Sequence, residues 1–467
     1  MSSRRKNKRC FKMEKTGGHL ILKRSFLFIG FIFSLVSTGT AGYTPGLGDL
    51  SCGQEGQKRC SFFSKEFWLN GSGGCDRGLT VRKGKCHQKK RNRLKNEDHR
   101  WVSETIKFQR EMQADLPLNQ ISFLWLHNAF NNRSDGYTFP NHKYSVTDLL
   151  DLGARVFEVD THIVGKRIRL CHGQYNHVGC SLLDRLYFNI IEELNIWIRK
   201  EENKNEVVIL KIQDQSDGRH DLVELPLMHH LKDLILFDHE GKHEYPTLNE
   251  MRKVGKRIVI LGGSFPYSVE KIGKRTAIKN FDGRLCQFMN DEGNEVLWTH
   301  DPTFEGGKSK EWQSVYWDAT VYPFFWDGEK ETGKITPQLV KKIVECNITG
   351  LEIDMMSPEH AYNFIWTWEE NEPKNWHKEK RCAFITKNGR WKSGSCESKR
   401  PFACQSEQNP GIWAVTRYQG SFEEGKEACQ RERLQFKFSH PQNGWENARL
   451  YKNHAREAWI HFKNEIN

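Results

Sequence analysis

Polar side chains able to do chemistry stand at the ends of apolar segments in this chain. His127 and Asn128 follow the apolar run 121–126. Glu158 and Asp160 lie two residues apart in a second apolar run, so in a strand both side chains point to one face. Burying so many polar groups costs free energy unless they serve one another, a metal ion or a ligand. These residues therefore predict a buried polar site.

Three more side chains extend the same pattern. His172 stands near the end of the run 167–173, and Lys211 and Gln213 share a face of the run 206–213. Carboxylates with an amide oxygen form a hard oxygen site that suits Ca²⁺ or Mg²⁺. Two histidines beside such an ion suit acid–base chemistry on a phosphate ester. A lone histidine at a strand end is usually structural, so the prediction depends on the ordered set.

The segments that carry these residues alternate with amphipathic ones across residues 116–360. Strands are expected at 121–127, 155–162, 167–173, 206–213, 257–263 and 350–356, and helices at 145–153, 182–201 and 336–346. Apolar strands that alternate with helices predict a parallel sheet covered by helices. The fold class is therefore α/β, and about 240 residues suit a TIM-type β/α barrel. An open doubly wound sheet is the alternative, although no G-x-G-x-x-G follows the first strand.

Four motifs occur in order along this region, and they read LHNAFNN, LGARVFEVDTH, LCHGQ and EVVILKIQ. Together they resemble the X-region of phosphatidylinositol-specific phospholipase C. The resemblance implies that His127 is the general base that deprotonates the inositol 2-hydroxyl, and that His172 protonates the leaving glycerol oxygen. The products would be a cyclic inositol phosphate and diacylglycerol. Lys211 is expected to hold the substrate phosphate.

The same resemblance implies a metal site. In metal-dependent members, the positions that match Asn128, Glu158 and Asp160 hold Ca²⁺, whereas metal-independent members carry an arginine at the second carboxylate. Asp160 therefore favours a metal. Gln213 departs from the pattern, because metal-dependent members have a glutamate there and one negative charge is lost. We expect Ca²⁺, or alternatively Mg²⁺, at these four residues with weakened affinity, and Asp214 is expected to point to the other face.

Two other function classes fit part of the pattern. Spider-type sphingomyelinase D and glycerophosphodiesterases are similar in their two histidines, their E-x-D pair and a loop bounded by cysteines. Here Cys171 and Cys180 bracket His172. Against this alternative, the H-N dipeptide matches phospholipase C better, and the spacing from His127 to Glu158 is long for the sphingomyelinase type. The third class is a non-catalytic adhesion or lectin-like binding protein that keeps the barrel as a scaffold.

The region 361–467 is rich in tryptophan and cysteine. Its first part, with WTWEENEPKNW and PFAC, resembles the second half of a C-type lectin-like domain, and 413–460 resembles the first half. Because the halves stand in reversed order, we expect a permuted single domain, and two truncated repeats are the rival interpretation. The resemblance implies two disulfides, which are Cys382–Cys396 and Cys404–Cys429.

Sugar-binding lectins of that family resemble one another in two triplets that ligate Ca²⁺. The matching triplets here are Glu372-Pro373-Lys374 and Trp391-Lys392-Ser393, which lack several of the oxygen ligands. We therefore expect this region to pack or to contact a protein, and calcium-dependent glycan binding is the less favoured alternative.

The N-terminal part of the 467-residue chain predicts export. Residues 1–41 contain a basic stretch, an apolar run at 26–36 and then small residues, which is the order of a secretory signal. An uncleaved signal anchor is the alternative. Residues 42–115 are expected to form a Cys-rich lobe with two disulfides and a basic linker. Of the 13 cysteines, all but one follow the apolar run, and this even number favours disulfides in an exported chain.

The remaining signals concern modification and partners. Sequons at Asn70, Asn132 and Asn347 are candidate glycosylation sites. The basic patch at 89–95 is either a solvated linker or attracted to anionic lipid headgroups. No nucleic-acid-binding module accompanies the net charge of +12, so no nucleic-acid partner is expected. The sequence thus predicts a secreted phosphoric diester hydrolase of lipid metabolism, acting at a membrane surface on phosphatidylinositol or on glycosylated phosphatidylinositol anchors.

Overall fold

A computed structural model describes residues 94–262 and 335–464, apart from 95, 138–139, 174–176, 238–244, 347 and 377. It also describes short stretches of 52–88 and the backbone of four strands between 272 and 316. The predicted signal at 1–41 and the basic residues of the patch at 89–95 lie outside the described residues. In the part of the chain that is described, no helix combines the length and the apolarity that a membrane crossing requires.

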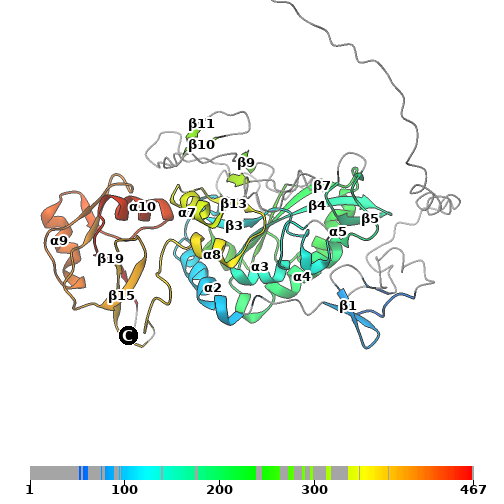
Figure 1. The fold of residues 1–467 in the computed structure, drawn as a ribbon, viewed down its shortest axis with the longest axis horizontal. Coiled ribbons are helices and arrows are strands. Elements are labelled where there is room, and N and C mark those ends of the chain that lie inside the picture. The colour runs from blue at the N-terminus through cyan, green and yellow to red at the C-terminus, as the bar shows by residue number, and fades with distance from the viewer. Residues whose placement is uncertain are drawn as a thin grey trace, which may run out of the picture. The chain divides into compact units, whose positions relative to one another are not determined.

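A parallel sheet forms the centre of the α/β body (Figure 1). Its strands, in spatial order, are β8 (Ile258–Leu261), β7 (Val208–Gln215), β4 (Val156–Val164), β3 (Phe123–Leu126), β13 (Gly350–Ile353), β12 (Trp312–Tyr316) and β9 (Ile272–Ala277). The strands β3, β8 and β13 are wholly buried and nearly continuous in apolar residues, as expected for a sheet covered on both faces. No pairing joins β8 to β9 among the described strands, so closure into the expected barrel is not shown.

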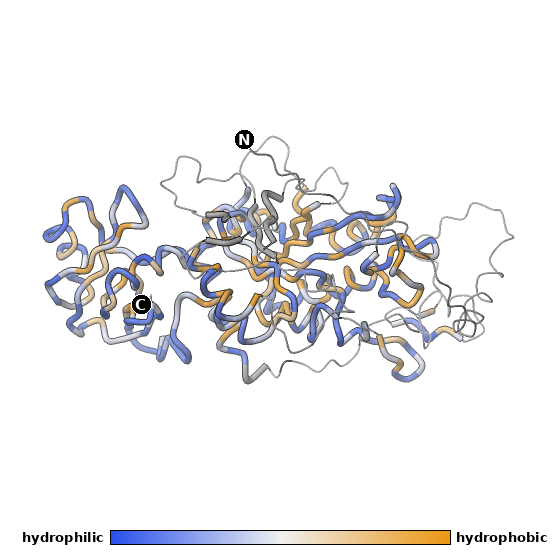
Figure 2. Tube along the Cα trace, turned by 45° about the horizontal axis from the view of Figure 1, so that its top comes forward, coloured by the Kyte–Doolittle hydropathy of each residue, from blue (hydrophilic) through white to orange (hydrophobic). Residues whose placement is uncertain are grey.

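Helices follow the strands and cover the sheet. They are α2 (Asn96–Glu111), α3 (Val146–Leu152), α4 (Tyr187–Ile198), α5 (His220–His230), α6 (Leu248–Lys253), α7 (Pro337–Glu345) and α8 (Pro358–Phe364), with single 3-10 turns at Leu118–Gln120, Arg133–Asp135 and Glu201–Asn203. Ser145 and Thr247 begin α3 and α6 with capping boxes, which satisfy backbone N–H groups that have no partner within the helix. Figure 2 shows the apolar residues gathered along the central strands.

One expected strand has a different role from the one predicted. β5 (Arg167–Leu170) pairs antiparallel with the end of β4, and β6 (Arg185–Leu186) pairs antiparallel with β5. The segment 167–173 is therefore part of an appended hairpin and does not belong to the parallel sheet. Its apolar residues resemble those of a barrel strand because Ile168 and Leu170 are buried as well. A pattern this short does not indicate whether the strand pairs parallel or antiparallel with its neighbour.

The boundary expected at residue 115 is too late. The helix α2 lies in the segment interpreted as a linker, yet Val102 and Ile106 belong to the main apolar core. Its Arg110 also donates to Glu206 over 2.6 Å in a buried ion pair. The α/β body therefore includes α2. The apolar face of this helix is narrow, and its many charged residues make that face hard to recognise in the sequence.

Two short hairpins are separate from the central sheet. The N-terminal lobe contains the hairpin of β1 (Leu79–Arg82) and β2 (Lys85–Gln88), and a second short hairpin joins β10 (Gln287–Met289) to β11 (Glu295–Leu297). The two disulfides expected in the lobe are confirmed as Cys52–Cys60 and Cys75–Cys86.

The C-terminal region contains two three-stranded sheets and two helices. The strands are β14 (Arg381–Ile385), β15 (Trp391–Ser395), β16 (Ala403–Ser406), β17 (Trp413–Val415), β18 (Phe436–Phe438) and β19 (Ala458–Lys463), and the helices are α9 (Gly425–Glu432) and α10 (Gly444–Asn453), preceded by a 3-10 turn at Phe422–Glu424. β19 pairs with β14, so the two sequence halves share one sheet. The disulfides Cys382–Cys396 and Cys404–Cys429 are confirmed, whereas the likeness to C-type lectins stays a prediction.

The sequon at Asn132 is not an accessible glycosylation site. Its side chain is fully buried, donates to the carbonyl of Phe130 and accepts from the backbone N–H of Asp135. A bulky glycan has no room at such a position. The sequons at Asn70 and Asn347 lie outside the described residues.

Candidate active site

Two parallel strands bring a histidine and a carboxylate together at the edge of the sheet where both strands end. Leu126 of β3 is level with Ile353 of β13, so the residues just beyond them meet. His127 Nδ1 and Asp354 Oδ1 lie 3.1 Å apart, and both side chains are buried. The carboxyl ends of parallel strands are where such folds gather their functional groups.

The carboxylate of Asp354 controls the charge of His127. Burial disfavours the imidazolium, but the attraction and hydrogen bond of Asp354 outweigh it and raise the pKa of His127 to about 9. Burial alone would raise the pKa of Asp354, yet the neighbouring imidazole holds it below its ordinary value. The Nδ1–H group therefore donates to Asp354, and the proton that titrates is the one on Nε2, which lies 2.9 Å from Asn128 Nδ2.

Asn141 joins this pair to the second histidine. Its Nδ2 donates to Asp354 Oδ1 over 2.8 Å, and its Oδ1 accepts from His172 Nε2 over 2.8 Å. Asn131 Nδ2 also donates to Asn141 Oδ1, over 2.7 Å. One hydrogen-bond network thus holds His127 and His172 at fixed places.

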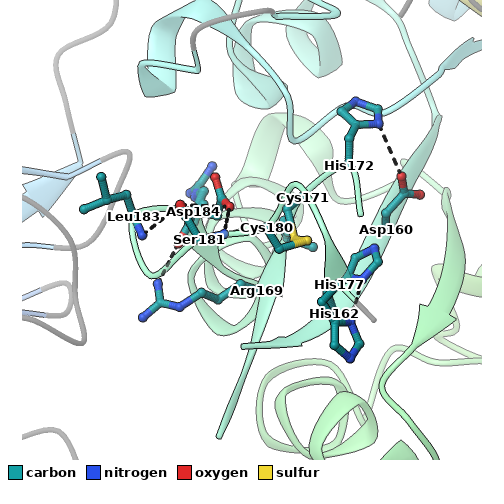
Figure 3. The surroundings of a disulfide bond; sticks show 12 residues. Asp160, His162, Arg169, Cys171, His172, His177, Cys180, Ser181, Leu183 and Asp184 are labelled. Carbon is teal, nitrogen blue, oxygen red and sulfur yellow. Dashed lines mark hydrogen bonds and ion pairs between the residues drawn. A yellow bond between two sulfur atoms is a disulfide. The ribbon is translucent and has the colours of Figure 1, made fainter. Parts of the chain in front are cut away.

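The two histidines differ in exposure and in their second nitrogen. The His172 side chain is 36% exposed and that of His127 is 5% exposed. His172 Nδ1 lies 3.8 Å from Asp160 Oδ2, and Figure 3 shows the ring directed toward that carboxylate. A protonated His172 therefore presents its Nδ1–H on the side of the E-x-D carboxylates.

The other side chains expected from the sequence converge beside the histidines. Glu158 and Asp160 are level with Lys211 and Gln213 on the neighbouring strand β7. Lys211 Nζ lies 2.9 Å from Glu158 Oε1 and 3.4 Å from Glu352 Oε1, and the amide of Gln213 donates to the same Glu158 oxygen. Asp214, as expected, turns away and contacts His220 at 2.5 Å.

Part of this chain matches a known protein family. Residues 86–222 match the family model described as the Rv2075c PI-PLC-like domain. The chain contains a PI-PLC-like domain. The matched segment includes all seven side chains expected from the sequence, whereas Asp354 and Glu352 lie beyond it.

Relatives that match most of the chain come from Mycobacterium tuberculosis. The uncharacterized protein Rv2075c of strain ATCC 25618 / H37Rv and the uncharacterized protein MT2135 of strain CDC 1551 / Oshkosh are each 25% identical over 401 residues. The match covers 78% of this chain and 80% of each relative. The likeness therefore extends well beyond the PI-PLC-like domain.

Solved structures of phosphatidylinositol-specific phospholipase C from Staphylococcus aureus are also similar. A form with pentafluoro-Phe incorporated has a TM-score of 0.37 and 12% identity, and the match covers 56% of this chain and 98% of that one. A structure of the same enzyme from work on its membrane binding has a TM-score of 0.37 and 13% identity, with 58% and 95% covered. At so low a TM-score the likeness supports no inference about residues.

The metal site expected in the PI-PLC-like domain can be tested against these contacts. Asn128 Oδ1 is buried and has no hydrogen-bond partner among the described residues, which suits a ligand. However, the Lys211 ammonium and the Gln213 amide both occupy Glu158 Oε1. A divalent cation would compete with two N–H donors for that oxygen, so these residues fit a Ca²⁺ ion poorly.

Sequence reasoning missed several residues of the PI-PLC-like domain and its surroundings. Glu352 and Asp354 form a second E-x-D pair in the run GLEIDMM, two residues apart like the first pair. This repeated spacing could have identified both residues from the sequence. No sequence pattern identifies Asn141, because it stands in a loop. His142 Nε2 donates to the His127 carbonyl over 2.7 Å, and burial lowers the pKa of His142 to about 4, so its ring is neutral.

Proposed function

We propose that this protein is a phosphodiesterase that cleaves phosphatidylinositol-type lipids, including glycosylated phosphatidylinositol anchors, by acid–base catalysis. One observation carries the proposal, namely the network in which Asp354 and Asn141 join His127 to His172. Two histidines held in one network, one of them paired with a buried carboxylate, can serve as base and acid in one phosphoryl transfer.

His127 is the base in this proposal. Its Nε2 takes the proton of the inositol 2-hydroxyl, and the imidazolium that forms is stabilised by Asp354, which also fixes the ring through Nδ1. The freed 2-oxygen attacks phosphorus. His172 gives a proton to the glycerol oxygen as the bond between phosphorus and that oxygen breaks, and the products are a cyclic inositol phosphate and diacylglycerol.

The positive charge beside the phosphate is proposed to come from Lys211. Its ammonium contacts Glu158 and Glu352 and lies 5.2 Å from the centre of the Trp125 ring. A buried, hydrogen-bonded cation of this kind stabilises negative charge that develops on a phosphate. The Ca²⁺ or Mg²⁺ that the sequence predicts is the alternative proposal, and chelation separates the two.

The substrate is proposed to be reached at a membrane surface. Val178, Leu182 and Leu183 are 66%, 39% and 49% exposed, and all three lie in the segment that follows His172. Exposed apolar patches mark contacts with an apolar partner, and a membrane is the partner proposed for this segment. Export is proposed as well, because the described disulfides are typical of proteins folded in an oxidising compartment.

Turnover by the purified full-length protein tests the proposal. It is incubated with vesicles that contain phosphatidylinositol and, separately, sphingomyelin, with and without EDTA. Release of a cyclic inositol phosphate supports the proposal, and release of choline supports the sphingomyelinase alternative instead. His127→Ala and His172→Ala should each abolish inositol phosphate release, and unchanged turnover in either variant would show that the assignment of base and acid is wrong.

A further inference from the structure

A disulfide and a pair of histidines fasten the loop that carries His172 at two points. Cys171 directly precedes His172 and pairs with Cys180, nine residues further along the chain. Cys171 is buried at the end of β5. The bond thus closes a short loop whose first residue is the proposed acid (Figure 3).

The second fastening connects the same loop to the central sheet. His177 Nδ1 lies 2.9 Å from Nδ1 of His162, which belongs to β4, and His177 Nε2 lies 2.7 Å from Asp217 Oδ2. Asp217 can only accept, so His177 donates through Nε2 and accepts at Nδ1 from the N–H of His162. Burial, and then the neighbouring His177, lower the pKa of His162 to about 4, so its ring is neutral and can make this bond.

The loop packs too closely for any residue but glycine at two positions. A Cβ at Gly173 would lie 2.3 Å from His162 Cε1 and 2.8 Å from Cys180 Sγ. A Cβ at Gly179, whose φ is +103°, would lie 2.6 Å from the carbonyl oxygen of His172. The backbone of His172 is therefore in contact with the far end of its own loop.

The disulfide and the histidine contact restrict the loop that carries the ring of His172. That ring has a hydrogen bond of 2.8 Å with Asn141, and its Nδ1 lies 3.8 Å from Asp160. A partly exposed ring on an untethered loop would sample many positions, and only a few allow proton transfer. Misplacement by about 1 Å costs roughly 100-fold in rate.

We infer that the Cys171–Cys180 disulfide and the contact between His162 and His177 are positioning devices for His172, and that they set the rate at which the leaving oxygen is protonated. This inference rests on the proposed function. None of the four residues touches the substrate in this scheme, so their effect must appear only in steps that need the proton of His172.

Leaving groups of different basicity provide the test. Phosphatidylinositol loses an alkoxide that needs a proton, whereas p-nitrophenyl inositol phosphate loses a weakly basic phenolate that does not. The Cys171→Ser/Cys180→Ser double variant and His177→Ala should lower kcat for phosphatidylinositol by roughly 10- to 100-fold, with KM nearly unchanged. Both should keep kcat for the p-nitrophenyl substrate. His172→Ala defines the full effect, and Cys382→Ser/Cys396→Ser is the matched control, expected to affect neither substrate.

Equal losses with both substrates, or no loss with either, would overturn the inference. Hydrogen exchange gives a readout that does not need activity. Peptides from 167–186 should exchange faster in the Cys171→Ser/Cys180→Ser variant, while peptides from β3 should be unchanged. Unchanged exchange in 167–186 would count against the inference, whatever the activity of the protein. Failure of the wild-type protein to cleave either substrate would reject the proposed function separately.

Discussion

His127 Nδ1 and Asp354 Oδ1 lie 3.1 Å apart although 227 positions of the chain separate the two residues. The contact exists because β3 and β13 are parallel neighbours that end at the same level. It links the last strand of the body to the first, and it decides the basicity of the proposed base.

Replacing Asp354 by asparagine should move the pH dependence of the reaction. In the wild-type protein the base form of His127 increases as pH rises through its pKa of about 9, so kcat/KM should rise up to that pH. Asp354→Asn removes the carboxylate that favours the imidazolium, so this rise should shift down toward the ordinary value of 6.5. The maximal rate should fall by roughly 10²- to 10⁴-fold, because the imidazolium formed in the reaction is no longer stabilised.

The pH profile of kcat/KM between pH 5 and pH 10, a range chosen to span roughly these two pKa values, measures this shift. Asp214→Asn is the control, since Asp214 stands at a strand end but contacts His220 instead. An unchanged profile in Asp354→Asn would mean that His127 is not the group that limits the rate.

Asn141→Ala should impair turnover without abolishing it. The variant removes the partner that His172 and Asp354 share, so each ring and carboxylate gains freedom. We expect kcat to fall by roughly 10- to 100-fold. Steady-state kinetics with phosphatidylinositol vesicles checks this. The control is Asn195→Ala in α4, because Asn195 accepts an exposed hydrogen bond from Arg199. A change in KM alone would indicate a role in substrate binding instead.

Lys211→Met and chelation together test the origin of the positive charge. If Lys211 supplies it, dialysis against EDTA should leave activity intact, and Lys211→Met should lose most of it because the ammonium that contacts Glu158 and Glu352 is removed. Lys204→Met, at an exposed pair with Glu201, should be harmless. Loss of activity in EDTA with recovery on adding Ca²⁺ would instead support the metal site that the sequence predicts.

A buried ion-pair network around Arg185 should contribute strongly to stability. The Arg185 guanidinium is fully buried and contacts Asp135 over 2.8 Å and Glu193 over 2.7 Å. Arg185→Leu leaves two carboxylates without their cation and should lower the free energy of unfolding by roughly 3–5 kcal/mol. Urea unfolding measures this, and Arg219→Leu, at an exposed pair with Asp221, should change it by less than about 1 kcal/mol. Similar effects in both variants would contradict the burial argument.

Charge introduced into the segment after His172 should weaken membrane contact. Val178→Asp/Leu183→Asp places two anions among exposed apolar residues, and co-sedimentation with phosphatidylinositol vesicles should decrease several-fold. Turnover of a soluble inositol phosphodiester should be unchanged, since neither side chain belongs to the hydrogen-bond network. Leu434→Asp is the control, because Leu434 is 87% exposed in the C-terminal region. Equal binding of all variants would rule out this segment as the membrane contact.

By itself the sequence determined the strands that position the site, the carboxylates Glu158 and Asp160 on β4, and the histidines His127 and His172 just beyond the ends of β3 and β5. These follow from local signals, because apolar runs and two-residue spacing report which side chains share a face. The disulfides Cys382–Cys396 and Cys404–Cys429 were also available at this level through the resemblance of the C-terminal region.

Only the tertiary structure decided which groups pair. Asp354 and Asn141 became partners of the histidines through strand order and loop packing, which no local pattern encodes. The same holds for Lys211, whose charge suggested a phosphate ligand but whose ammonium contacts Glu158 and Glu352. Pairing depends on contacts between residues far apart in the chain, so composition and spacing could name the chemical groups but not the partner of each.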